Sequence, residues 1–278
     1  MIKDIICWWS GGVTSAVACN MANDLFPNQC RFIFIDTKNE DDDTYRFMKD
    51  CQELYDSEIE TISSDSYSGV KECWYKHLSL NVATGAICSY KLKRVVREKW
   101  EKKNKFRHQV FGFDINESKR AISIKANHSQ TNPIFPLMMY GLEKTDCIEM
   151  IESYGIEVPK MYQLGFQNNN CFKTGCVQGG IGYWQKIKRE YPEKFNNMAK
   201  IEHELSDIKK EPVTMLKDQS NSAKEKNNQK VFLKKHPDYP NTKCIDDMKG
   251  REPKPLFECN GFCGTNDFTP NETQKELF

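Results

Sequence analysis

Short apolar runs alternate with longer segments of helical periodicity over the first two-thirds of the chain. Strand-like runs, rich in β-branched and aromatic residues, lie at 2–9, 30–36, 59–63 and 109–113, and helix-like segments lie at 14–26, 44–56, 70–78, 90–103 and 144–154. This alternation is typical of parallel strands with helices packed on both faces of one sheet. The pattern predicts an α/β fold with a doubly wound, mostly parallel sheet. The domain that contains this sheet is expected to end near Pro159.

The rest of the chain is predicted to be a helical, cysteine-rich region. Residues 167–182 are rich in Asn, Gly and Cys, and helices are expected over 183–190 and from Pro192 to about residue 208. Residues 217–230 contain almost no apolar side chain, so we expect a mobile excursion or linker there. We therefore predict an α/β domain at 1–160 and a C-terminal region at 161–278.

Composition excludes two classes of protein. The 278 residues carry 40 Lys and Arg against 39 Asp and Glu, a balance that argues against a protein that coats a polyanion. No apolar run approaches the roughly 18 residues of a membrane span. The apolar N-terminal stretch is too short for a signal peptide, so we expect a cytoplasmic protein.

The twelve cysteines divide by their surroundings. Six stand singly in apolar or helical stretches, where buried small side chains are expected: Cys7, Cys19, Cys30, Cys51, Cys73 and Cys147. Cys171 with Cys176, and Cys259 with Cys263, form two close pairs flanked by Gly and Asn, as in loops that wrap a metal. The positions of Cys88 and Cys244 do not decide between these interpretations.

A glycine-containing loop, Ser10-Gly11-Gly12-Val13-Thr14-Ser15, lies between the first predicted strand and the first predicted helix. There, backbone amides can approach an oxyanion, and the helix N-terminus favours negative charge. The loop lacks the lysine of a Walker motif, which excludes that type of phosphate site. A plain glycine turn is the alternative interpretation.

Four segments together resemble a known family. They are Ser10 to Ser15, Phe34-Ile35-Asp36-Thr37 with Glu40 and Thr44-Tyr45, Cys88-Ser89 with Leu92-Lys93, and Gly112 through Glu117-Ser118 to Arg120. In this order they resemble the PP-loop ATP pyrophosphatases, in the branch of the phosphoadenosine phosphosulfate (PAPS) reductases and adenine nucleotide α-hydrolases. The resemblance implies a PP-loop, HUP-like fold.

The resemblance also implies ATP or a related adenine nucleotide as ligand, with Mg²⁺ to offset the phosphate charge. The implied nucleotide-binding residues are Ser10, Gly11, Gly12, Val13, Thr14, Ser15, Asp36, Thr37, Lys93, Gly112, Glu117 and Arg120. Asp36 is expected to hold ribose or Mg²⁺, or to act only as a turn or cap acid.

Two positions depart from the family pattern. Thr14 stands where many PP-loop enzymes have Asp, and Phe113 stands where sulfonucleotide reductases have Arg. Loss of that guanidinium removes the bidentate partner of a sulfate or phosphate, which argues against sulfate recognition.

The cysteine pairs predict a metal centre. Cys171, Cys176, Cys259 and Cys263 supply four soft ligands, as a 4Fe–4S cluster or tetrahedral zinc requires, and similar segments recur together in the reductase-like branch. Four unligated thiols are the alternative. Cys88 is a candidate nucleophile, because a helix N-terminus and nearby cations favour the thiolate, and also an alternative ligand. Lys93, Arg94 and Arg97 are expected either to contact phosphates or to form a solvated helix face.

The favoured function is an enzyme that cleaves ATP to AMP and pyrophosphate to activate an acceptor, with sulfur transfer downstream. A thiol-dependent PAPS reductase, in which Cys259 attacks sulfur, is one alternative, and a non-catalytic nucleotide-binding subunit of a modification or defence complex is another. The acceptor class (tRNA, DNA or a small metabolite), a sulfur-donor protein and a homo-oligomer are left open, and no membrane partner is expected.

Overall fold

A computed structural model describes residues 3–82, 85–169 and 171–254 of the chain. Its centre is a five-stranded sheet in the order β3-β2-β1-β6-β7, with every neighbouring pair parallel. The strands are β1 (Ile5–Trp9), β2 (Cys30–Asp36), β3 (Ile59–Ser63), β6 (His108–Val110) and β7 (Pro133–Ile134). The prediction of an α/β fold with a parallel sheet is confirmed.

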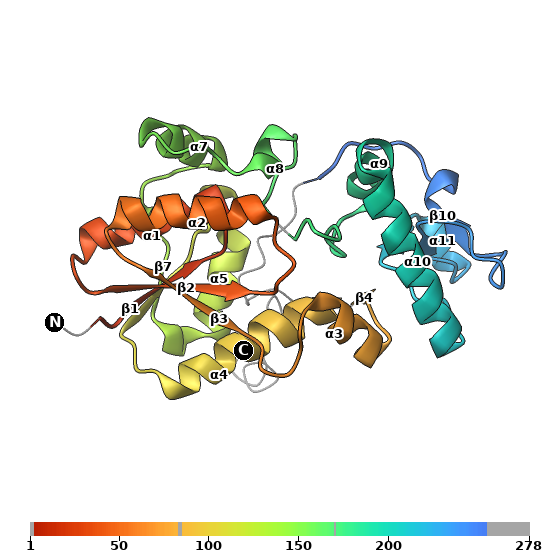
Figure 1. Ribbon diagram of the computed structural model, residues 1–278, viewed down its shortest axis with the longest axis horizontal. Coiled ribbons are helices and arrows are strands. Elements are labelled where there is room, and N and C mark those ends of the chain that lie inside the picture. The colour runs from red at the N-terminus through yellow and green to blue at the C-terminus, as the bar shows by residue number, and fades with distance from the viewer. Residues whose placement is uncertain (1–2, 83–84, 170, 255–278) are drawn as a thin grey trace.

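Helices cover both faces of this sheet (Figure 1). One face carries α1 (Val13–Leu25), α2 (Asp42–Tyr55) and α7 (Lys144–Ser153), and the other carries α4 (Val95–Lys103) and α5 (Ser118–Asn127). The alternation in β1 explains this arrangement, because Ile5, Cys7 and Trp9 point into the first layer while Ile6 and Trp8 point into the second. A strand buried on both faces reads as a continuous apolar run.

Shorter elements connect these layers. They are α3 (Val70–His77), the two-stranded β4 (Asn81–Val82) and β5 (Gly85–Ala86), a π-helix η1 (Ser89–Arg94), the 3₁₀ turns η2 (Ile115–Glu117) and η3 (Ser129–Thr131), α6 (Pro136–Met139) and α8 (Lys160–Gln163). The predicted helix over 90–103 is thus a π-helix followed by α4. The helix α5 and the edge strand β7 were not predicted, because neither has a clear apolar period.

The C-terminal region contains more strand than expected. Beside α9 (Ile181–Glu190) and α10 (Pro192–Lys209) lies a three-stranded sheet of β8 (Leu216–Lys217), β9 (Lys230–Phe232) and β10 (Lys243–Cys244), with α11 (Asn221–Glu225) and the 3₁₀ turn η4 (Ile245–Asp247). The predicted excursion at 217–230 therefore contains α11 and the start of β9, with Ala223 buried, and its mobility stays a prediction.

An apolar core joins the C-terminal region to an earlier part of the chain. Trp74 and Leu92 pack in one cluster with Phe172, Trp184 and Met198. The core thus crosses the boundary predicted near residue 160, and the division into two domains stays a prediction. Within the described residues, no helix is both long and apolar enough to cross a membrane.

Candidate functional site

The glycine loop Ser10–Ser15, called the phosphate loop below after its predicted role, lies where the strand order of the sheet reverses. From β1 the chain continues to β2 on one side, and β6 pairs with β1 on the other. Open α/β sheets bind ligands in the crevice at this position, outside the carboxyl ends of the strands. The loop after β1 and the loop after β6 meet there.

Hydroxyl groups hold the phosphate loop in shape. Ser15 Oγ accepts a hydrogen bond from the Ser10 amide at 3.0 Å, lies 2.9 Å from Ser10 Oγ, and donates to the Gly12 carbonyl at 2.9 Å. Gly11 has a φ of +92°, in the region that favours glycine. The serines thus stabilise the turn itself, and the backbone of residues 11–15 is buried around it.

Gly112, after β6, packs directly on this loop. A Cβ atom at residue 112 would lie 2.4 Å from Ser15 Cα and 2.6 Å from Ser15 N. Only glycine permits this approach, so Gly112 acts by letting the two loops meet at the reversal point.

One amide of the loop already has a partner. The Val13 N–H donates to the Tyr162 hydroxyl at 3.2 Å, and Tyr162 lies on α8. The first amides of a helix are the donors that an anion uses. Tyr162 therefore occupies one donor of the predicted phosphate site.

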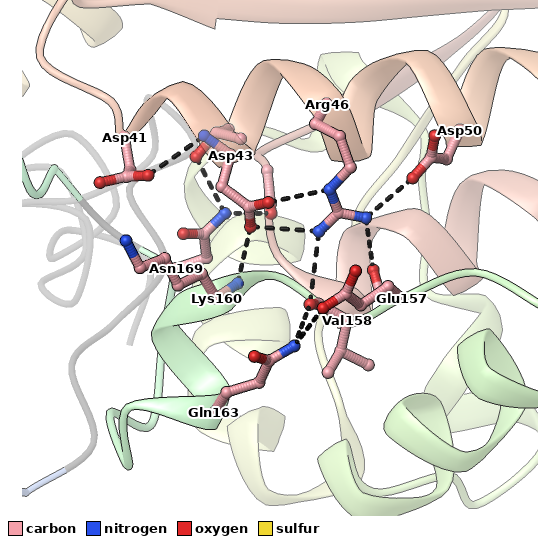
Figure 2. A network of polar contacts seen from close by, with 11 residues as sticks. Asp41, Asp43, Arg46, Asp50, Glu157, Val158, Lys160, Gln163 and Asn169 are labelled. Atoms are coloured by element: carbon pink, nitrogen blue, oxygen red, sulfur yellow. Dashed lines mark hydrogen bonds and ion pairs between the residues drawn. The ribbon is translucent and has the colours of Figure 1, made fainter.

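A polar network fixes α8 against α2 (Figure 2). Arg46 donates to the carbonyls of Glu157 at 2.7 Å and Val158 at 3.4 Å, and the Lys160 amide donates to Asp43 Oδ2 at 2.6 Å. Asp41 caps α2 by accepting from the Asp43 amide at 3.1 Å. Asp41, Asp42 and Asp43 thus lie at the N-terminus of α2, where negative charge is favoured, and the network also positions Tyr162.

Asn169 ties the cysteine-rich loop to the phosphate loop. Its side-chain amide donates to the Gly11 carbonyl at 2.8 Å and to Thr44 Oγ1 at 3.1 Å. The next residues dock on the loop after β2, because the amides of Phe172 and Lys173 donate to the Asn39 carbonyl at 3.1 and 3.2 Å. These bonds bring Cys171 and Cys176 to the edge of the sheet where the phosphate loop lies.

A narrow pocket is formed where these segments meet. Its lining includes Ser10, Thr37, Glu40, Cys88, Lys93, Asn169, Cys171 and Cys176, with Trp74 and Val70 as an apolar wall. The pocket is narrow, so a small reacting group fits in it.

A buried ion pair polarises the pocket. Lys93 Nζ lies 3.7 Å from Glu40 Oε1, and both side chains are 6% exposed. Glu40 also accepts from Thr37 Oγ1 at 2.9 Å and from the Asn39 amide at 3.0 Å. Burial raises the pKa of Glu40, Lys93 opposes this effect, and the nearby Asp36 carboxylate adds to it. The pair holds an ammonium group beside the thiols.

Asp36 lies at the end of β2, where its side chain accepts hydrogen bonds from nearby residues. Its Oδ1 accepts from the Lys38 amide at 2.6 Å and from the Tyr45 hydroxyl at 3.0 Å. These bonds fit the interpretation as a turn acid, and the nearness of Glu40 also leaves two carboxylates together for a cation.

Cys88 directly precedes the π-helix η1, from which Ser89 and Lys93 also line the pocket. Widened helical turns of this kind occur frequently at functional sites. Cys171 Sγ lies 3.6 Å from Thr37 Oγ1 across the same pocket. Three of the predicted cysteines therefore converge on one space from two distant segments of the chain.

The structure corrects the interpretation of the basic residues that follow Cys88 as a solvated face. Lys93 and Arg97 are 5% and 1% exposed, and Arg97 pairs with Glu101 at 3.0 Å. Burial lowers the pKa of Arg97, and Glu101 opposes this. Arg94 pairs with Glu98 at 3.0 Å.

Other predicted residues lie apart from the pocket. Glu117 and Arg120 form an ion pair with each other, and neither lines the pocket. Phe113 is 1% exposed and stacks on Phe135, and the Arg120 guanidinium lies 4.2 Å above its ring. Cys259 and Cys263 lie outside the described residues, so their role as ligands stays a prediction.

The sequence also contained residues whose roles were missed. They are Asn169, which the sequence shows only as one residue of an Asn-rich segment, and Tyr162. No local pattern identifies either, because their partners Gly11 and Val13 lie about 150 positions away along the chain. By contrast, the six single cysteines are all buried, as predicted.

The glycines of residues 175–182 serve packing. Gly175 has a φ of +86°, and a Cβ there would lie 2.6 Å from the Trp184 ring. The adjacent Cys176 amide donates to the Tyr183 hydroxyl at 3.1 Å. The first turns of α9 thus fix the backbone that presents Cys176.

Tyr162→Phe is expected to strengthen anion binding at the phosphate loop. The change frees the Val13 amide and keeps the ring, and one hydrogen bond corresponds to about 1 kcal/mol, or roughly fivefold in affinity. Calorimetric titration with ATP measures the change. Tyr154→Phe is the control, because Tyr154 is an exposed tyrosine. Weaker ATP binding by Tyr162→Phe would mean that the Tyr162 hydroxyl contacts the ligand.

Comparison with known proteins places most of the site within one family. Residues 4–178, more than half of the chain, match the phosphoadenosine phosphosulfate reductase domain. No curated protein matches the chain significantly. The crystal structure of phosphoadenylyl-sulfate (PAPS) reductase from Candida auris, a phosphate complex, is similar with a TM-score of 0.46 and 14% identity, covering 62% of this chain and 83% of that chain.

Proposed function

Because the chain belongs to the phosphoadenosine phosphosulfate reductase domain family, we propose that it is an adenine-nucleotide enzyme of sulfur metabolism that cleaves ATP to AMP and pyrophosphate. The observation that carries the proposal is the convergence of Cys88, Cys171 and Lys93 on a pocket that Ser10 of the phosphate loop also lines. Sulfur transfer requires a nucleotide-activated acceptor and a sulfur nucleophile to meet, and this pocket brings the thiols next to the loop that is proposed to bind the nucleotide.

The proposed reaction has two steps. An acceptor oxygen attacks the α-phosphorus of ATP, the bond to the β-phosphate oxygen breaks, and pyrophosphate leaves. A sulfur nucleophile then displaces AMP from the acceptor. The loop amides would bind the leaving pyrophosphate, whose charge a bound Mg²⁺ would offset, and Lys93 would stabilise negative charge that develops in the pocket it shares with the thiols.

A sulfonucleotide reductase is the second candidate, because the family match favours it. Two features of the chain argue against it. Phe113, at the position of the family's Arg, is packed in the core, and the thiol that would attack sulfur, Cys259, lies after the matched residues. A subunit that binds nucleotide without turnover is the remaining alternative.

The products distinguish these functions. With ATP, Mg²⁺ and candidate acceptors we expect AMP and pyrophosphate in chromatography of the nucleotide pool, and Lys93→Met should lower their formation by at least about tenfold. Lys99→Met is the matched control, because Lys99 is exposed on α4. ADP as the sole nucleotide product would overturn the proposal. Conversion of PAPS to the bisphosphate and sulfite would favour the reductase, and ATP binding without products would favour the subunit.

The pocket also fits a thiolate-bound metal in its donor set. Cys88, Cys171 and Cys176 are soft ligands of the kind that zinc and iron–sulfur clusters use. Among the described residues, the three sulfur atoms do not gather within 4.8 Å of one another. We therefore propose Cys171 and Cys176 with Cys259 and Cys263 as ligands, and Cys88 as the alternative.

Metal content tests this ligand set. After anaerobic purification, Ser substitution at each of Cys171, Cys176, Cys259 and Cys263 should lower bound iron or zinc, because each thiolate supplies one bond to the metal. Cys244→Ser is the control, since Cys244 is buried beside η4. Full metal content in Cys259→Ser and Cys263→Ser, together with loss in Cys88→Ser, would replace the late pair by Cys88.

A further inference from the structure

A second cluster of potential metal ligands lies away from the phosphate loop, in the C-terminal region. Asp207 is on α10, and His236 and Asp238 follow β9. One ligand atom from each of the three lies within 4.8 Å of the others. In the part of the chain that the structure describes, no other three His, Cys, Asp or Glu side chains bring one ligand atom each within this distance.

His236 shows that the cluster is more than exposed acids. Its side chain is 2% exposed, and its Nε2 has no hydrogen-bond partner among the described residues. Nε2 lies 3.4 Å from Asp207 Oδ1, but the geometry is not that of a hydrogen bond. A buried polar atom without a partner is costly, so an unpartnered Nε2 only 3.4 Å from the Asp207 carboxylate, in a cluster that also includes Asp238, calls for a ligand.

Aromatic packing holds the imidazole ring in place. Ring centroids of His203, Tyr239 and Phe232 lie 4.4, 4.8 and 5.3 Å from that of His236. Nδ1 accepts from the Asp238 amide at 3.2 Å, which leaves the proton of the neutral ring on Nε2. Coordination through Nε2 moves this proton to Nδ1 and breaks the hydrogen bond from the Asp238 amide. Metal binding should therefore change the hydrogen exchange of that amide.

We propose that Asp207, His236 and Asp238 bind a divalent transition metal, with Zn²⁺ as the best fit. An imidazole with two carboxylates suits Zn²⁺ better than Mg²⁺ or Ca²⁺, which take oxygen ligands. Asp207 and Asp238 are exposed, so water completes the coordination shell. The metal joins α10 to the segment after β9 and stabilises this region independently of the nucleotide chemistry.

Co²⁺ titration of the full, chelator-treated chain tests the proposal, because thiolate-bound Co²⁺ has a sulfur charge-transfer band that a His and carboxylate site lacks. Beside any thiolate bands from the proposed cysteine site, we expect a second set of Co²⁺ visible bands without sulfur charge transfer, displaced by Zn²⁺. His236→Gln should abolish them, and Asp207→Asn, an exposed change that the fold tolerates, should weaken binding by about tenfold or more. Zn²⁺ should also alter amide exchange at Asp238.

Asp246→Asn is the matched control, an exposed acid of the same region that pairs with Lys188 and lies outside the cluster. It should leave the Co²⁺ bands unchanged. Co²⁺ bound only with thiolate charge transfer, or bands that persist unchanged in both His236→Gln and Asp207→Asn, would show that His236 and Asp207 form an ion pair without a metal. Either result overturns the site and leaves the proposed ATP chemistry untouched.

Discussion

Gly112→Ala is expected to disrupt the phosphate loop and lower activity by on the order of 100-fold. The added Cβ would lie 2.4 Å from Ser15 Cα, 2.6 Å from Ser15 N and 2.9 Å from the Thr14 carbonyl carbon. These are backbone atoms at the start of α1, so the two loops have to separate. A shift of about 1 Å in positioned groups costs on the order of 10²-fold in rate, and overpacking costs about 1–3 kcal/mol in stability.

Gly250→Ala is the matched control, because a Cβ there has nothing within 4 Å. It should leave ATP binding and the thermal midpoint unchanged. Calorimetry with ATP and thermal unfolding measure the two effects of Gly112→Ala separately. A folded Gly112→Ala variant with unaltered ATP affinity would remove this crevice from the nucleotide site.

Glu202→Gln is expected to destabilise the C-terminal region by about 1–3 kcal/mol. Glu202 is fully buried on α10, and its two carboxyl oxygens accept from the Met215 amide at 3.1 Å and the Leu233 amide at 2.7 Å. One carboxyl group thus joins α10 to the start of β8 and the end of β9. Glutamine replaces one acceptor by an NH₂ group that faces an N–H, and leaves that amide without a partner.

The same group makes stability depend on pH. Burial raises the pKa of Glu202 to about 8, although the two backbone N–H groups lower it. The unfolded chain has a Glu pKa of about 4.3, so the folded state binds the proton more tightly between these values. The contribution of Glu202 to the free energy of unfolding is therefore full below about pH 4.3 and is lost as pH rises through about 8.

Chemical denaturation between pH 5 and 9, about the interval where this proton is released, measures both effects of Glu202. The stability difference between wild type and Glu202→Gln should narrow as pH rises. Glu211→Gln, which removes an exposed carboxylate paired with Lys209, should show no such change. Parallel pH curves for wild type and Glu202→Gln would mean that Glu202 is ionised in the folded protein at neutral pH.

Long-range partners explain features of the structure that local composition does not reveal. The run from Lys217 to Lys230 has the composition of a linker, yet it carries α11 and leads into β9, because Glu202 binds the ends of β8 and β9 from another helix. Lys93 and Arg97 have the charge of a solvated face, but Glu40 and Glu101 allow them to be buried. Charged residues are buried when paired, and the pairing is not visible in local composition.

The sequence alone determined the parallel α/β fold, the position of the glycine loop Ser10–Ser15 between β1 and α1 and the six buried single cysteines. These features depend on apolar periodicity, on a short glycine motif and on local apolar surroundings, all of which are local properties. Only the tertiary structure decided that Gly112 packs on Ser15, that Tyr162 occupies the Val13 amide and that Cys88 faces Cys171 and Cys176 across one pocket. Each of these depends on contacts between segments far apart in the chain, which packing of the helices and loops on the sheet brings together.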